Sequence, residues 1–463
     1  MSDFVFVLPL VKDDLRRAEN IGQYFVKDVL TTSEIASKVR EHLSKKKSVG
    51  ECDIIDSFDL LYSSLVSSAL SSQGRKKAAP KSAKFVEWSS EKVKALVCLQ
   101  NLFELHLQRL WSPQPVEEEF INLVADCCFK LVEDPSSAKT AGVREAVTAI
   151  LGLNVKKHSY GLACVVKIIQ LLQTCEHAAV FFADAMLTFV RKFGVTHIVG
   201  DTIRELCRLD SLESAQESGS IRNMATFLVE LSERMPELVL KSASLLDSLL
   251  DIKSCTIRNS VLTVFSKAVL AVLSRDDLAP GEKELRDLLL DKLEAHLEDE
   301  NAFVRSHVLQ LWQELCVRGV IPLGRQHALA ATVAGRLLDR SSMVRRHAVC
   351  FLATSLDCNP FSAKDCVHFA KQMKTIVPTL CDLLRSPTVS DVQETIAFFV
   401  SAHRFGVEDA SVGLREMLPL MWSAEAGVRE AVVSSYREVY FDAKSGGNSR
   451  RVCSRRPGGR GTR

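Results

Sequence analysis

One heptapeptide, Ala-Gly-Val-Arg-Glu-Ala-Val, occurs twice in the chain, at Ala141–Val147 and again at Ala426–Val432. Between the two copies lie related pairs of a hydrophobic residue and an arginine, at Ile257-Arg258, Val304-Arg305 and Val344-Arg345, with a degenerate Val392-Gln393. From Ile257 onward the successive pairs are 36 to 48 residues apart. A motif that recurs at such spacings indicates a chain built from stacked copies of one supersecondary unit.

Each of these pairs opens an amphipathic helix. After Val304, apolar residues fall at the spacing of a single helix face, at Val308, Leu311, Trp312 and Leu315. A second amphipathic segment, Leu285–Leu297, precedes this helix, and the polar turn 298–301 between them is rich in residues that cap helix N-termini. The repeating unit is therefore predicted to be helix, tight turn, helix. The predicted fold class is all-α, an α-solenoid of HEAT-type helical-hairpin repeats.

The composition agrees with a solenoid that works in a reducing compartment. A chain of 463 residues is too long for one compact core, but in a solenoid each repeat buries its apolar face against its neighbours. The 14 cysteines are scattered without metal-ligand spacing, and several fall in apolar helical runs, where a reduced thiol packs as a small hydrophobe: Cys164, Cys207, Cys316 and Cys350.

Neither a secretory signal nor a membrane span is expected. The apolar stretch Phe4–Val11 is short, contains Pro9 and lacks a basic leader, and no run approaches the ~20 apolar residues of a membrane-spanning helix. The chain is therefore expected to be soluble and intracellular. Because the formal net charge is only +2, any affinity for nucleic acid must come from local basic patches or from partners.

Four segments are expected along the chain. Residues 1–65 are predicted to form an N-terminal helical cap, and residues 66–87 a basic Ser/Ala-rich linker. The HEAT-repeat solenoid is predicted over residues 88–441. Residues 442–463 are Gly/Arg-rich without an apolar face, which predicts a disordered tail.

No motif for catalysis is present in the sequence. A phosphate-binding loop, an H-E-x-x-H zinc motif, a dinucleotide fingerprint and a nucleophile elbow are all missing. We therefore predict no catalytic, cofactor-binding or metal-binding residues, no cofactor and no enzyme activity.

The arginines of the repeated pairs are interpreted first as structural. At the start of the second helix of a hairpin, such a guanidinium can bond a carbonyl or an acidic group in the adjacent turn, and Asp299 and Asp339 are the evident partners. The arginines so interpreted are Arg144, Arg258, Arg305, Arg345 and Arg429. Arg346, directly after Arg345, cannot share its helix face and is left as a candidate for an outward, DNA-facing contact.

Two basic clusters are candidates for contact with nucleic acid. Arg75, Lys76, Lys77, Lys81 and Lys84 lie in the predicted linker without nearby acidic residues, which suits phosphate binding or nuclear import, although a solvated linker is an equal alternative. Lys156 and Lys157 end a predicted helix, where cations also complement the helix dipole.

Longer strings resemble a known family. They include Val166–Leu172, Phe303–Ser306 with Val308–Leu311, and Asn359–Ser362, and their ordered succession runs through residues 4–441. The chain resembles the condensin complex subunit 1 family, the D-type HEAT subunits of condensin I. Members of that family are longer, and the closing Gly/Arg segment resembles nothing in them, so the resemblance implies a truncated or alternative form.

The resemblance implies a regulatory, non-ATPase subunit of a chromosome-compacting complex. Its implied partners are a kleisin subunit, the SMC ATPase heterodimer, a second HEAT subunit and DNA or chromatin without sequence preference. The implied location is the nucleus and chromosomes in mitosis and the cytoplasm in interphase. The alternative is a HEAT-repeat transport receptor or adaptor that carries cargo and does not contact DNA.

Overall fold

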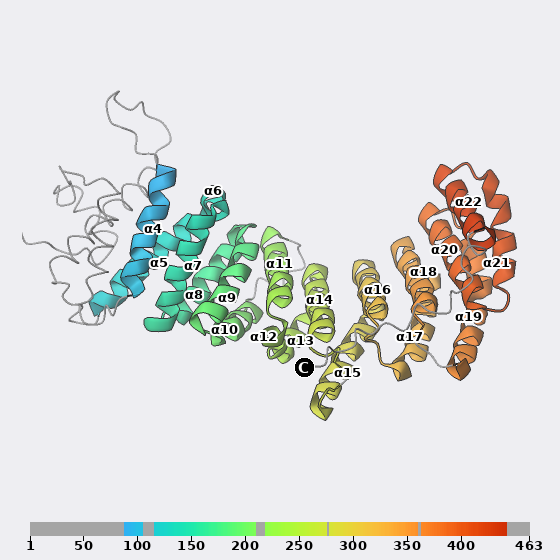
Figure 1. The fold of residues 1–463 in the computed structure, drawn as a ribbon, viewed down its shortest axis with the longest axis horizontal. Coiled ribbons are helices and arrows are strands. Elements are labelled where there is room, and N and C mark those ends of the chain that lie inside the picture. The colour runs from blue at the N-terminus through green and yellow to red at the C-terminus, as the bar shows by residue number, and fades with distance from the viewer. Residues whose placement is uncertain (1–87, 105–114, 210–217, 276, 360–362, 442–463) are drawn as a thin grey trace, which may run out of the picture. The chain divides into compact units, whose positions relative to one another are not determined.

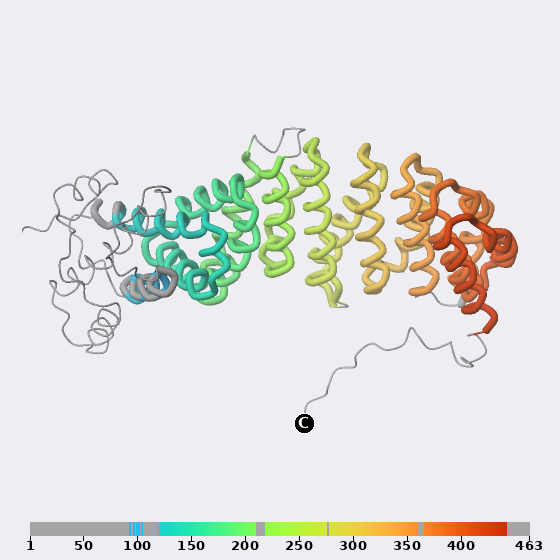
Figure 2. Tube along the Cα trace, turned by 90° about the horizontal axis from the view of Figure 1, so that it is seen from above, coloured from blue at the N-terminus to red at the C-terminus, as the bar shows by residue number. Residues whose placement is uncertain are grey.

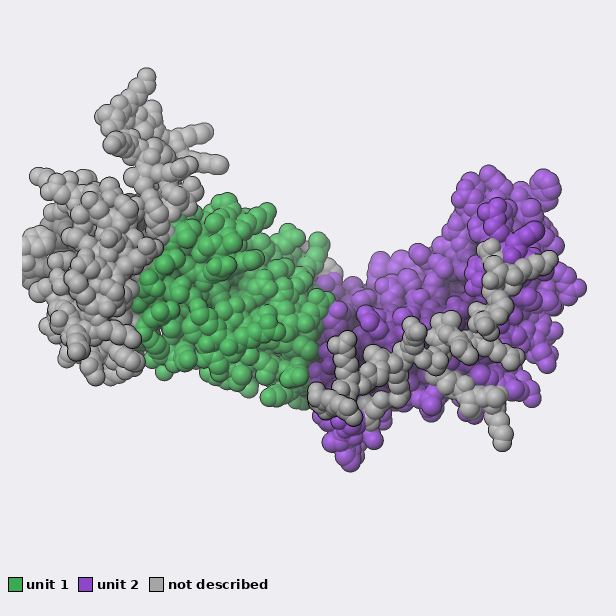
Figure 3. Space-filling view, viewed as in Figure 1, with its two compact units in different colours: residues 1–211, 217–245 green, residues 212–216, 246–463 purple. Residues whose placement is uncertain are grey.

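A computed structural model describes residues 88–104, 115–209, 218–275, 277–359 and 363–441 of the chain. Within these ranges every regular element is a helix, as Figure 1 shows. The segments predicted as N-terminal cap, basic linker and disordered tail lie outside the described residues. The chain divides into two compact units, residues 1–211 with 217–245 and residues 212–216 with 246–463 (Figure 3), and each unit is described by itself.

Unit 1 consists of hairpins stacked side by side. Its helices are α4 (Trp88–Glu104), α5 (Pro115–Glu133), α6 (Pro135–Lys139), α7 (Ala141–Lys157), α8 (Gly161–Thr174), α9 (Ala178–Phe193), α10 (His197–Cys207), α11 (Gly219–Arg234) and α12 (Pro236–Leu240). One row of helices runs α4, α7, α9, α11, each packed on the next, and α8 packs on α10 in the other row. The short helix α13 (Ala243–Asp247) spans the boundary between the units.

Unit 2 repeats the same hairpin with a 3-10 turn before most second helices. Its elements are η3 (Ser248–Asp251), α14 (Cys255–Ala271), α15 (Pro280–Ala295), η4 (His296–Glu298), α16 (Ala302–Val317), α17 (Leu323–Gly335), η5 (Arg336–Leu338), α18 (Ser342–Asp357), α19 (Ala363–Leu383), α20 (Val389–Phe405), α21 (Ala410–Glu416), η6 (Leu418–Trp422) and α22 (Ala426–Tyr440). The second helices of the hairpins, α14, α16, α18, α20 and α22, pack successively side by side (Figure 2). The predicted all-α solenoid of HEAT-type hairpins is confirmed.

The second helix of each hairpin begins where the sequence predicts. In α16 the side chain of Asn301 accepts a hydrogen bond from the Phe303 N–H at 2.8 Å, and in α14 Ser254 caps the Ile257 N–H in the same way. Val304 and the apolar residues that follow it on the predicted face, among them Trp312, are buried. The helix phase read from the sequence is therefore confirmed for α16.

The described cysteines form no disulfide. Cys164 and Cys316 are buried, and burial raises the pKa of each thiol to about 12, which keeps it protonated at neutral pH. Among the described helices, none is both long and apolar enough to cross a membrane.

Substitution of Val304 with aspartate should destabilise unit 2 strongly. The Val304 side chain is fully buried, so the variant places an unpaired carboxylate between packed helices, at a cost of several kcal/mol, roughly 3 or more. Phe303→Asp is the matched control, because Phe303 is the preceding residue and is 61% exposed. Urea unfolding of both variants measures the difference, and equal midpoints would contradict the helix phase.

Candidate nucleic-acid interface

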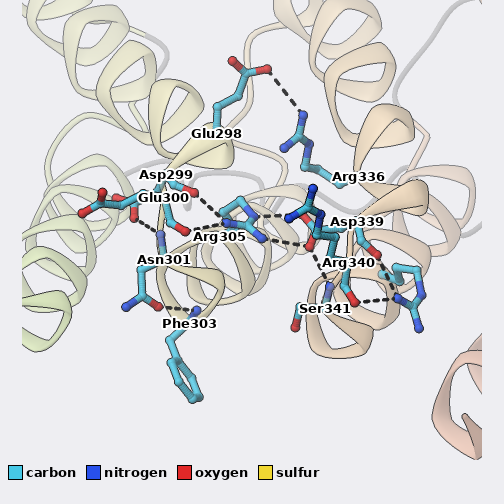
Figure 4. Close-up of polar contacts among 11 residues, drawn as sticks. Glu298, Asp299, Glu300, Asn301, Phe303, Arg305, Arg336, Asp339, Arg340 and Ser341 are labelled. Atoms are coloured by element: carbon cyan, nitrogen blue, oxygen red, sulfur yellow. Dashed lines mark hydrogen bonds and ion pairs between the residues drawn. The ribbon is translucent and has the colours of Figure 1, made fainter.

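Three repeat arginines of unit 2 bind aspartates of the following hairpin; Asp299 and Asp339 lie in its turn, and Asp391 lies in the first turn of α20. Arg258 donates from Nη2 to Asp299 Oδ1 at 2.9 Å. Arg305 binds Asp339 through two parallel bonds, from Nε at 2.8 Å and from Nη2 at 2.9 Å (Figure 4). In α18, Arg345 donates from Nη2 and Nε to Asp391 Oδ2 at 2.6 and 3.0 Å. We call these three pairs the arginine–aspartate ladder.

The other end of each guanidinium holds its own turn. Arg305 Nη1 donates to the carbonyl oxygens of Asp299 and Glu300 at 2.7 and 3.1 Å. Arg345 makes the same two contacts with the carbonyls of its own turn, at 2.8 and 3.2 Å. Arg258 Nη1 likewise donates to the carbonyls of Ile252 and Lys253, so each ladder arginine ties the carbonyls of its own turn to a carboxylate of the following hairpin.

The aspartates of the ladder are almost completely buried. Their side chains are 6% exposed in Asp299, 5% in Asp339 and 0% in Asp391. Burial disfavours the charged form of Asp339, but hydrogen bonds from Arg305 and the Ser341 N–H outweigh it and hold the pKa of this carboxyl below its usual value. Asp299 and Asp339 are thus partners of these arginines, as the sequence suggested, but each serves the arginine of the preceding hairpin.

The two remaining repeat arginines have weaker or partial contacts. Arg144 in unit 1 lies 3.9 Å from Asp184, a residue in the middle of α9 rather than in a turn, and Asp184 also accepts from Arg234 Nε at 2.7 Å. Arg429 in α22 contacts carbonyls only, those of Ser423 and Ala424. The sequence analysis missed one further pair, Ile221-Arg222 at the start of α11, although its spacing from Ile257 fits the series.

The structure describes three of the predicted DNA-binding residues, Lys156 and Lys157 in unit 1 and Arg346 in unit 2. Arg75, Lys76, Lys77, Lys81 and Lys84 lie outside the described residues. Arg346 is half exposed and forms an ion pair with Glu394, Nε to Oε1 3.1 Å. Lys157 donates to the carbonyl oxygens of Phe103 and Glu104, at 3.0 and 2.6 Å, at the end of α4. Of the described candidates, Lys156 alone is exposed without a contact of this kind.

Lys156 has basic neighbours that the sequence analysis missed. Arg191 and Lys192 are exposed in the last turn of α9, the helix that packs on α7. The end of α9 packs against the C-terminal half of α7, because a Cβ added at Gly152 would lie 2.5 Å from the Phe193 ring. Basic residues just before Gly194, a left-handed C-cap with φ +73°, are a recognisable helix-end pattern. We call Lys156, Arg191 and Lys192 the α7–α9 edge.

The two chain segments that contain the α7–α9 edge have no acidic residue. The segments 146–175 and 185–200, which contain the ends of both helices and the turns after them, have neither aspartate nor glutamate. Three exposed cations in such surroundings suit the phosphates of a nucleic acid, which are bound by charge without reading sequence. Part of this pattern also follows from the helix dipole, which favours cations at C-terminal ends. No cluster of metal-ligand residues occurs among the described residues.

The pair Arg305–Asp339 should behave as one energetic unit. Arg305→Gln or Asp339→Asn leaves the other group buried without its partner, so each variant should lose about 3 kcal/mol of unfolding free energy. The double variant should lose less than the sum of the two. Arg346→Gln is the control, because its half-exposed pair should contribute less than about 1 kcal/mol. Strictly additive losses in urea unfolding would contradict the coupling.

Charge reversal at the α7–α9 edge should weaken DNA binding. In the variant Lys156→Glu, Arg191→Glu, Lys192→Glu, affinity for duplex DNA should fall about ten-fold or more, and the salt dependence should become shallower by about three ions. A second variant, Lys76→Glu, Lys77→Glu, Lys81→Glu, tests the predicted linker separately. Lys253→Glu, Lys283→Glu, Arg318→Glu, at exposed positions of unit 2, is the charge-matched control. Fluorescence anisotropy at several salt concentrations decides among them.

Comparison with known proteins identifies the family. A family model described as the non-SMC mitotic condensation complex subunit 1, N-terminal part, matches residues 59–164. Condensin complex subunit 1 of Homo sapiens is 37% identical over 315 residues, which cover 67% of this chain and 22% of the human protein. Its counterpart in Xenopus laevis is 28% identical over 554 residues, covering 82% of this chain and 40% of that protein.

Among solved structures, Kap121p matches with a TM-score of 0.38 at 12% identity, over 93% of this chain and 49% of that one. A designed armadillo repeat protein in complex with a (KR)4 peptide matches with a TM-score of 0.32 at 13% identity, over 59% of this chain and 98% of that one. The chain belongs to the condensin complex subunit 1 family and spans less than half the length of the curated relatives it matches.

Proposed function

We propose that the protein is a regulatory, non-ATPase HEAT subunit of condensin that promotes mitotic chromosome condensation. In this role it binds the kleisin subunit, the SMC ATPase heterodimer and chromatin, in a complex that also holds a second HEAT subunit. The observation that carries the proposal is the 37% identity to human condensin complex subunit 1 over 67% of this chain.

A role as a scaffold fits the chemistry of the described residues. In unit 2 the ladder arginines are held inside the stack by carboxylates and carbonyls, where they stabilise the relative position of successive hairpins. The sequence has no phosphate-binding loop, so we assign ATP hydrolysis to the SMC partners. In this role the chain binds partners through its surface, as is usual for helical-repeat proteins.

We assign the contact with chromatin to exposed basic residues that are free of acidic partners. The α7–α9 edge provides three, and the linker residues Arg75, Lys76, Lys77, Lys81 and Lys84 provide a second cluster in the sequence. Such contacts bind phosphates of any sequence and weaken with salt, which suits a protein that compacts whole chromosomes. The proposed location is accordingly the nucleus and chromosomes in mitosis, and the cytoplasm in interphase.

Affinity purification from mitotic extract tests the proposal directly. The tagged full chain should recover the SMC heterodimer and the kleisin subunit, identified by mass spectrometry, and should label mitotic chromosomes in cells. The Val304→Asp variant is the control, because it should lose the partners with its fold. Recovery of a transport GTPase and cargo in place of SMC proteins would favour the alternative, a transport receptor or adaptor without DNA contact, and would sink the condensin assignment.

A further inference from the structure

The hydroxyl of Ser386 binds the aspartate of the third ladder pair. Its Oγ donates to Asp391 Oδ2 at 2.9 Å, the same oxygen that accepts from Arg345 Nη2 at 2.6 Å and from Arg345 Nε at 3.0 Å. Ser386 Oγ also accepts from the Thr388 N–H at 3.2 Å. One serine hydroxyl therefore connects the loop between α19 and α20 to the carboxylate that holds the preceding hairpin.

The Arg345–Asp391 pair is less completely bonded than the pair before it. Asp339 uses both oxygens, because Arg305 donates to each of them and the Ser341 N–H also donates to Oδ1. In Asp391 three donors meet on Oδ2, and Oδ1 has no hydrogen-bond partner among the described residues. The serine is thus one of three groups that offset the charge of a carboxylate that is 0% exposed.

Ser386 is accessible from the loop. It is half-buried and lies outside the helices, between Arg385 and Pro387, which are both exposed. A proline disfavours helical backbone in the residue before it, which favours an extended conformation at Ser386. A serine followed by proline in an exposed loop is an acceptor for protein kinases that select proline after the acceptor. The sequence has one other such pair, Ser112-Pro113, outside the described residues.

A phosphate on Ser386 conflicts with the Arg345–Asp391 pair. Phosphoserine carries a charge of about −1.5 to −2 at neutral pH, and its Oγ has no proton to donate. The hydrogen bond to Asp391 is then replaced by repulsion between two anions. Arg345 already makes four hydrogen bonds, two to Asp391 and one each to the carbonyls of Asp339 and Arg340. Since a guanidinium has five donors, a phosphate can accept more than one of them only by taking donors from Asp391.

The cation next to Ser386 in the sequence also has acidic partners. Arg385 is 63% exposed and forms ion pairs with Asp382, at 3.3 Å, and with Glu416. A phosphate in this loop therefore meets two arginines that are already paired with carboxylates. Such surroundings disfavour an added dianion, so the modification should weaken the contact between the hairpins.

We propose that Ser386 is a phosphorylation site of a proline-directed protein kinase, and that its phosphate loosens the α19–α20 hairpin from the α17–α18 hairpin. Ser386 Oγ attacks the γ-phosphorus of ATP, and the Oγ–P bond forms as the bond from that phosphorus to ADP breaks. A carboxylate of the kinase takes the hydroxyl proton. The phosphate then repels Asp391, which loses part of its attachment to Arg345. The inference goes beyond the proposed function and does not depend on it.

Kinase treatment of the full chain tests the site. The chain with Ser112→Ala, in which Ser386 is the one remaining serine followed by proline, is incubated with a mitogen-activated protein kinase and Mg-ATP and mapped by mass spectrometry. We expect phosphate on Ser386, and none at this position in Ser386→Ala. Pro387→Ala keeps the hydroxyl but should lower the rate of phosphorylation about ten-fold or more, because the proline ring that the kinase selects is lost. A chain that stays unmodified at Ser386 would overturn the site.

Phosphoserine inserted at position 386 during translation tests the consequence without a kinase. Hydrogen–deuterium exchange of the α20 amides should become about ten-fold faster or more, because a hydrogen bond to a buried carboxylate is replaced by repulsion. The amides of α14 are the internal reference. Ser386→Ala removes the hydrogen bond without adding charge and should have a smaller effect.

Asp391→Asn decides whether the phosphate acts through this carboxylate. In that background phosphoserine should change the exchange of the α20 amides by less than about three-fold, because the repelling charge is absent. An unchanged ten-fold effect would place the cause elsewhere and overturn the mechanism. Exchange in the phosphorylated chain that equals or is slower than that of the unmodified chain would show that the phosphate keeps or strengthens the contact, and would overturn the loosening.

Discussion

The structure of unit 2 depends on a guanidinium that is shared between two successive hairpins. A planar, permanently charged group with five donors can satisfy the carbonyls of one turn and a carboxylate of the next at the same time, which a lysine cannot do. Because the aspartates are 0 to 6% exposed, the charges are compensated by each other and by backbone groups rather than by water. Such a contact fixes the distance from one turn to the next, and with it the stacking of the helices behind them.

In unit 1 the repeat arginine also contacts a carboxylate, but in a different arrangement. There the carboxylate is Asp184, in the middle of α9, and Arg234 and Arg144 approach it from two helices. Arg144 at 3.9 Å, with a side chain 46% exposed, is held far less tightly than Arg305. An identical heptapeptide therefore has different surroundings at Ala141–Val147 and at Ala426–Val432. Local sequence determines the helix and its first turn, and the neighbouring hairpin determines what the arginine binds.

This difference explains which features of the structure could be predicted from the sequence and which could not. The hairpin, the start of α16 and its buried face follow from periodicity and capping residues, which are local. The pairing of Asp339 with Arg305 rather than with Arg345 depends on which hairpin stacks on which, and periodicity alone does not contain that information. For the same reason Arg346 could not be assigned to Glu394, and Lys157 could not be assigned to the carbonyls at the end of α4. Arg191 and Lys192 could have been found, because basic residues before Gly194 are a local pattern.

The ladder arginines are engaged inside the stack of hairpins. Only the remaining, exposed basic residues are therefore available to bind a partner. In unit 2 the ladder arginines are already occupied, so their number says nothing about affinity for DNA. At the α7–α9 edge, by contrast, Lys156, Arg191 and Lys192 have exposed side chains, and the two segments that contain them have no acidic residue. An arginine that is already paired with a buried carboxylate has few donors left for a phosphate, whereas an exposed cation without a competing carboxylate can attract a polyanion. The distinction between these two classes of arginine and lysine, rather than a net charge of +2, is what the proposed contact with nucleic acid depends on.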